Sequence, residues 1–110
     1  MWRGDLDEQY MELAQAIVRR ASMDYLALYY IKRRMNKPSY IARYMRTHEE
    51  EEYIQHVVHV MVEIKRIERF FREDMPLMYD IDPGCYIKRL REMSKTKRLL
   101  PDIRLRREKL

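Results

Sequence analysis

The stretch from residue 32 to residue 46 combines cations with aromatic rings in a pattern that could bind nucleic acid. Its cations are Lys32, Arg33, Arg34, Lys37, Arg43 and Arg46. Four tyrosines lie among them or just before them: Tyr29, Tyr30, Tyr40 and Tyr44. Cations pair with phosphates, and aromatic rings stack on exposed bases. One interpretation is a nucleic-acid contact surface, and the alternative is a solvated helix face whose tyrosines belong to the core.

A second basic cluster lies between Ser94 and Leu110. Its cations are Lys95, Lys97, Arg98, Arg104, Arg106, Arg107 and Lys109. With two acids among them, the segment carries a net charge of +5, which equals that of the whole chain. Basic arms of this kind often bind nucleic acid, although they also serve as solubilising ends. We therefore predict a helical domain over residues 1–93 and a basic tail over residues 94–110, whose cations are secondary candidates for binding.

The charges elsewhere are segregated along the chain. No acid occurs between Asp24 and Glu49, whereas residues 49–52 are four consecutive glutamates. In a helix-turn-helix, the helix that follows the basic stretch would enter the major groove. Four carboxylates at its start would be repelled by the phosphates, so the sequence disfavours this motif.

A file of polar side chains at helical spacing could hold a metal ion. Glu52, His56, His59 and Glu63 follow one another at steps of four, three and four residues. Imidazole and carboxylate groups on facing helices form metal sites in helical bundles, but a second helix would have to supply further ligands. The alternative is an exposed face with local ion pairs. We assign no metal ligand and no cofactor, and we keep a helical metal-binding protein as the second alternative.

Nothing in the sequence indicates catalysis. Cys85 is the single cysteine, no histidine is near it in sequence, and we expect it to be buried and structural. The chain has no Gly-rich phosphate loop and no Ser–His–Asp ordering. A lone cysteine forms no internal disulfide, and no signal peptide or membrane-spanning run is visible. We therefore expect a cytoplasmic protein with no membrane partner that acts by binding and is not an enzyme.

Length and composition favour a single all-α domain. The chain has 110 residues, of which only two are glycine and four are proline, while 37% are charged. A β-rich domain of this size needs more turn residues than this. We predict a helical bundle of three to five helices that is built on a long antiparallel pair.

The first long helix is predicted to run from Asp5 to about Asn36. Asp5 and Glu8 have the spacing of a capping box, and Pro38 cannot continue the helix. One stripe carries apolar residues at steps of three, four or seven: Leu6, Tyr10, Leu13, Ile17, Ala21, Tyr25, Leu28 and Met35. This stripe is the predicted core face of the helix.

Three further helices are predicted. A short helix spans residues 39–46, and Thr47 with Glu50 forms a capping-box pattern for a long helix that ends near Asp74. That helix carries an a/d seam of Tyr53, Val57, Val60, Ile64, Ile67 and Phe71. We expect this seam to pack against the first helix, although packing against another copy is the first alternative. Asp82-Pro83 is predicted to start the last helix, with Asp as its cap.

Two segments of the chain, residues 17–35 and 63–93, combine basic, aromatic and apolar residues. The pattern in the second is formed by Glu68-Arg69-Phe70-Phe71, Ile81-Asp82, Gly84 and Tyr86-Ile87-Lys88-Arg89-Leu90-Arg91. With these patterns the two segments resemble a small protein family found in phages and prophages of low-GC Gram-positive bacteria. The resemblance implies a phage or mobile-element origin and supplies no catalytic residues. Together with the basic stretch, it leads us to expect an accessory protein that binds nucleic acid or the host machinery that handles it. An inhibitor of a defence system, of the anti-CRISPR kind, is a special case.

Overall fold

The computed structural model describes residues 2–95 of the chain, and the side chains from residue 8 onward. Its elements are α1 (Trp2–Met35), α2 (Pro38–Tyr44), α3 (Glu50–Glu73), the 3₁₀ turn η1 (Met75–Leu77) and α4 (Pro83–Met93). No strand occurs among the described residues, so the expected all-α class is confirmed. No helix in this part of the chain is long and apolar enough to cross a membrane. The tail cations Lys97, Arg98, Arg104, Arg106, Arg107 and Lys109 lie outside the described residues.

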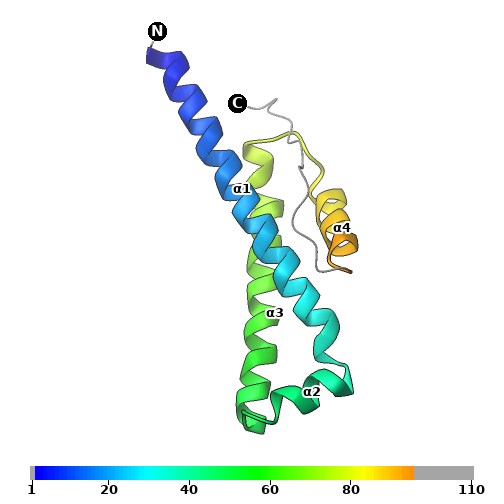
Figure 1. The fold of residues 1–110 in the computed structure, drawn as a ribbon. Coiled ribbons are helices and arrows are strands. Elements are labelled where there is room, and N and C mark those ends of the chain that lie inside the picture. Colours follow the sequence, from blue (N-terminus) through cyan, green and yellow to red (C-terminus); the bar gives the residue numbers. More distant parts are fainter. Residues whose placement is uncertain (1, 96–110) are drawn as a thin grey trace.

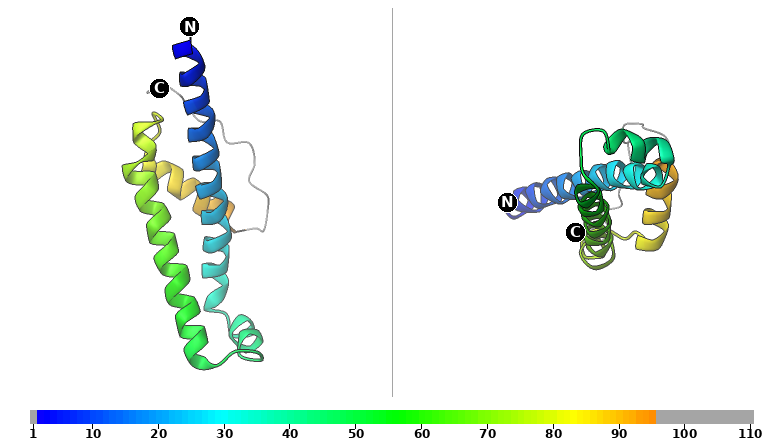
Figure 2. Two further views of the ribbon diagram at one scale, coloured as in Figure 1. Left: turned by 90° about the vertical axis from the view of Figure 1, so that its left-hand side faces the viewer. Right: turned by 90° about the horizontal axis from the view of Figure 1, so that it is seen from below.

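The architecture is a long antiparallel pair, α1 and α3, with α4 packed against one side of it (Figures 1 and 2). The short helix α2 connects the pair at one end, where it lies across the gap between them (Figure 1). At the other end, the first turns of α1 extend past the last turn of α3 (Figures 1 and 2). The molecule is elongated, with extents of 60 × 23 × 21 Å. The prediction of a bundle built on a long antiparallel pair is thus confirmed.

The predicted a/d seam of α3 packs inside this chain. Val60, Ile64 and Phe71 are buried, and Val57 and Ile67 pack against the same core. The core also takes in side chains of η1, of the loop after it and of α4, including Met75, Tyr79, Ile87 and Leu90. The seam faces α1 and is therefore not available to a second copy.

The predicted core stripe of α1 is wrong in its first half. Tyr10, Leu13 and Ile17 are 53%, 60% and 45% exposed, whereas Ala14 and Val18 are buried. The reason is that α1 packs against α3 and α4 together. The buried arc of α1 is therefore centred between those two neighbours and turned away from the richest apolar stripe.

The observed helix starts test the three N-terminal caps that the sequence predicts. α1 already begins at Trp2, so Asp5 lies within the helix instead of capping it. The residue before α3 is Glu49, whose side chain makes no capping bond, and Thr47 instead hydrogen-bonds to Nδ1 of His48 at 2.8 Å. The predicted Asp82 cap is confirmed, because its carboxylate accepts from the Gly84 N–H at 3.2 Å. Two of the three predicted caps are therefore wrong.

A polar network that ties α1, α3 and α4 together was not anticipated. The Tyr25 hydroxyl donates to Oε2 of Glu68 at 2.7 Å, and Nη2 of Arg91 reaches the same oxygen at 2.6 Å. Nε of Arg91 also donates to the Tyr25 hydroxyl oxygen at 3.0 Å. Burial by itself raises the pKa of Glu68, but these hydrogen bonds outweigh it and hold the pKa below its ordinary value. One charged triad thus joins the three main helices.

Candidate nucleic-acid interface

The end of α1, the helix α2 and the turn that leads into α3 form what we call the basic aromatic corner. Six side chains line a hollow of about 260 Å³ there: Arg34, Tyr40, Arg43, Tyr44, Thr47 and His48. No residue of α2 is fully buried. Because α2 contributes so little to the core, its side chains are available for contacts outside the chain.

A stack of aromatic rings forms one wall of the corner. Tyr44 stacks on His48 with ring centroids 4.1 Å apart and on His56 with centroids 4.9 Å apart, and both interplanar angles are 20°. Tyr40 joins through a hydrogen bond of 2.9 Å between its hydroxyl and Nε2 of His56. The ring stack therefore runs from the partly buried imidazole of His56 on α3 to the exposed imidazole of His48.

Two hydrogen-bonded tyrosines hold the corner in place. Burial and then the neighbouring His59 and His48 lower the pKa of His56, which favours its neutral ring, and Nε2 of this ring is hydrogen-bonded to the Tyr40 hydroxyl. Burial likewise raises the pKa of Tyr40. Tyr53 lies edge-on to Tyr44, and its hydroxyl donates to the Met35 carbonyl at 2.6 Å. These bonds connect α2 and α3 to the last turn of α1, so the rings are positioned before any ligand arrives.

The cations of the corner are not neutralised by acids. Arg34 donates from Nη1 to the Tyr30 hydroxyl at 3.1 Å, and its guanidinium lies 5.5 Å from the centre of that ring. Arg43 is exposed. Among residues 8–95, neither guanidinium forms an ion pair with a carboxylate. The aromatic contact orients Arg34 while leaving its charge available to an anion.

The other predicted cations have different positions. Arg33 donates from Nε to the Ser94 hydroxyl at 3.1 Å and from Nη2 to the Arg91 carbonyl at 3.0 Å, so it holds the end of α4. Lys32 lies 4.9 Å from the ring centre of Tyr29. The remaining two candidates from the basic stretch, Lys37 and Arg46, are exposed on either side of α2 but do not line the hollow. In the predicted tail, Lys95 pairs with Glu92 at 2.8 Å.

Sequence reasoning missed Thr47 and His48 as members of the corner. A signal was present, because Tyr40, Tyr44 and His48 are spaced four residues apart and continue one file past the end of α2. The sequence instead placed His56 in a polar file with His59 and Glu63, for which a metal site was one interpretation. No group of three or more metal-ligating side chains comes together in the part of the chain that the structure describes. His56 contacts α2, whereas His59 and Glu63 line a separate groove.

Cys85 is exposed, so the expectation of a buried cysteine is wrong. It occupies the first turn of α4, next to the capping residue Asp82. The Asp82 carboxylate raises the pKa of the thiol through a hydrogen bond and through its negative charge. The thiolate is therefore disfavoured, which is the opposite of what a nucleophile needs.

The corner offers two kinds of contact side by side. Its guanidinium groups can bind a phosphate in a bidentate manner, and its ring stack can be extended by another flat ring. Comparisons of the chain with protein-family models, with curated proteins and with solved structures found no match.

Proposed function

We propose that this protein binds single-stranded nucleic acid at the basic aromatic corner. The supporting observation is that Arg34 and Arg43 line the same hollow as a ring stack that ends in the exposed His48. A nucleotide carries a phosphate and a flat base only a few bonds apart, so one nucleotide can use both kinds of contact. Proteins that bind single strands combine a positively charged path for the backbone with rings on which bases stack.

Two features favour a single strand over a duplex. Among the described residues, no ring covers the outer side of His48, so a base that is not already stacked can lie there. The bases of a duplex are stacked on one another and are not available in this way. In addition, residues 49–52 are exposed glutamates at the edge of the corner. They would repel the second backbone of a duplex, whereas one strand can follow the α1 and α2 side.

We further propose a role as an accessory protein of phage type, which acts on nucleic acid or on the host machinery that handles it. Inhibition of a defence system, in the manner of anti-CRISPR proteins, would be one such role. This part of the proposal is supported by the sequence resemblance of residues 17–35 and 63–93. The corner is compatible with it, because a protein that carries a surface for single strands can compete with such machinery for its nucleic acid.

The direct test is the fluorescence anisotropy of labelled single-stranded DNA and RNA, and of duplexes of equal length, titrated at rising salt. The variant Arg43→Ala removes an exposed cation of the corner, and Arg69→Ala removes an exposed cation from α3, away from the corner. We expect Arg43→Ala to weaken single-strand binding several-fold and to reduce the salt slope by about 0.7, the value for one phosphate contact on a single strand. Arg69→Ala should change neither.

A second variant distinguishes nucleic acid from a basic protein partner. Replacing Glu49 and Glu50 with glutamine removes two exposed negative charges beside the corner. Binding of a nucleic acid should become tighter, because repulsion of the phosphates decreases, whereas binding of a basic protein should become weaker. Absence of any binding at low salt, or equal effects of Arg43→Ala and Arg69→Ala, would refute the proposed function.

A further inference from the structure

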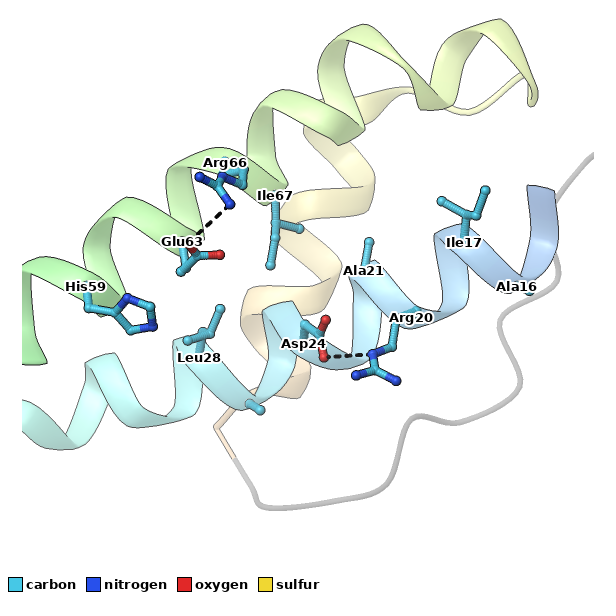
Figure 3. A pocket seen from close by; sticks show the side chains of 11 residues that line it. Ala16, Ile17, Arg20, Ala21, Asp24, Leu28, His59, Glu63, Arg66 and Ile67 are labelled. Atoms are coloured by element: carbon cyan, nitrogen blue, oxygen red, sulfur yellow. Dashed lines mark ion pairs between the residues drawn. The ribbon is translucent and has the colours of Figure 1, made fainter. Parts of the chain in front are cut away.

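An open groove runs between α1 and α3 on the side away from α4. Figure 3 shows it from close by, with the ribbon of α4 behind the pair and the groove in front. Its volume is about 900 Å³. The apolar part of the lining comes from small and branched side chains, namely Ala16, Ile17, Ala21, Ala27, Leu28 and Ile67. Every residue that lines the groove belongs to α1 or α3.

The apolar surface continues along α1 beyond the groove. Tyr10, Leu13 and Ile17 follow one another at steps of three and four, so they share a face with Ala21 and Leu28. All three are about half exposed. The first turns of α1 also extend past the end of α3, and isolated helical turns are marginal in water. A continuous exposed apolar face of this kind marks an interaction surface.

The charges in the groove indicate what covers it. On α1, Nε of Arg20 pairs with Oδ1 of Asp24 at 3.4 Å, and on α3, Nη1 of Arg66 pairs with Oε1 of Glu63 at 3.5 Å. The groove thus carries two cations and two acids, which gives no preference for a polyanion or for a strongly basic partner. It is instead complementary to itself. When two copies are related by a two-fold axis that passes between residues 20 and 24, Arg20 of one copy faces Asp24 of the other.

We propose that this face is the interface of an antiparallel homodimer, in which α1 and α3 of two copies form a four-helix arrangement. The proposed interface combines the groove with the exposed apolar residues Tyr10, Leu13 and Ile17, which continue it along α1. The interface differs from the one considered from the sequence, because the a/d seam of α3 is buried inside the chain. The proposal does not depend on nucleic-acid binding, since no residue of the corner lines the groove.

The test is the mass of the purified full chain, measured by sedimentation equilibrium over a concentration series. We expect a dimer at micromolar concentrations, and we expect Ile17→Glu to raise the dimer dissociation constant by at least about tenfold, because each copy buries one such anchor. The matched control is Val58→Glu. Val58 is 54% exposed on α3, compared with 45% for Ile17, and does not line the groove. This control should leave the dimer unchanged.

A measurement on the unaltered chain guards against a variant that fails to fold. Backbone hydrogen exchange should slow with rising protein concentration in residues 8–28 of α1, and it should remain constant in α4. A monomer at every concentration overturns the proposal. So does a dimer that Val58→Glu dissociates and Ile17→Glu does not, since the contact would then lie on another face. Hydrogen exchange in α1 that does not depend on protein concentration would indicate a monomer or a different interface, and it would also overturn the proposal.

Discussion

Removing the charge of Glu68 should destabilise the protein more than any other conservative change of an acid. Oε2 of Glu68 accepts one bond from the fully buried Tyr25 and one from Arg91. A hydrogen bond to a charged group contributes about 1 kcal/mol more than one between neutral groups. Glu68→Gln keeps the shape but loses this increment on two bonds, which gives about 2 kcal/mol. At roughly 4 °C per kcal/mol for a domain of this size, the melting temperature should fall by about 8 °C.

The assay is thermal unfolding followed by circular dichroism, with Glu73→Gln as the matched control. Glu73 is an exposed acid of the same helix whose only ion pair among the described residues, with Arg69, is 4.0 Å long. Its substitution should change stability by less than about 0.5 kcal/mol. Because the folded pKa of Glu68 is below its ordinary 4.5, its contribution is present above that pH and is lost as the pH falls through the lowered value. Equal melting temperatures for the two variants at pH 7 would refute this account of the network.

Two further predictions concern the corner and the residues beside it. Arg33→Ala should lower stability by about 1–2 kcal/mol, because two hydrogen bonds to the end of α4 are lost. In the anisotropy titration it should weaken nucleic-acid binding less than Arg43→Ala does. A larger loss of affinity for Arg33→Ala would contradict the structural role given to Arg33. The folded pKa of His56 is below 6.5, so the folded chain binds this proton less readily and stability should fall as the pH drops below 6.5. Melting temperatures at pH 7.5 and 5.5 should differ more for the wild type than for His56→Gln, and an equal difference would show that His56 is not responsible.

The long antiparallel pair could be predicted because its signals are local and strong. The steps of four and three from Tyr53 to Phe71 leave one face of α3 apolar, and any fold has to bury such a face. Asp82-Pro83 likewise specifies a helix start whatever lies around it, since the carboxylate and the proline ring act on their own backbone. In such cases the residues that form the signal are also the residues that make the contacts.

The rotation of α1 could not be predicted from its own sequence. Its richest apolar stripe passes through Leu13 and Ile17, yet the buried side chains are Ala14 and Val18. Which arc is buried depends on where α3 and α4 lie, and that is information about the tertiary structure. The Tyr25–Glu68–Arg91 network was missed for the same reason, since its members are 23 to 66 residues apart in sequence. The proposed dimer would bury the apolar stripe through Leu13 and Ile17. The apolar spacing along α1 would then still mark a packed surface, between two copies instead of within one.

Neighbouring cations of one type have separate roles that composition cannot reveal. Arg33 and Arg34 are adjacent, but successive residues of a helix point about 100° apart. Arg33 is thereby directed toward α4, where it hydrogen-bonds to the Arg91 carbonyl, whereas Arg34 is directed toward α2 and the hollow. A substitution that removes the whole basic stretch would therefore mix a loss of folding stability with a loss of binding. Only single changes can separate the two, such as Arg43→Ala, which breaks no internal side-chain bond among the described residues.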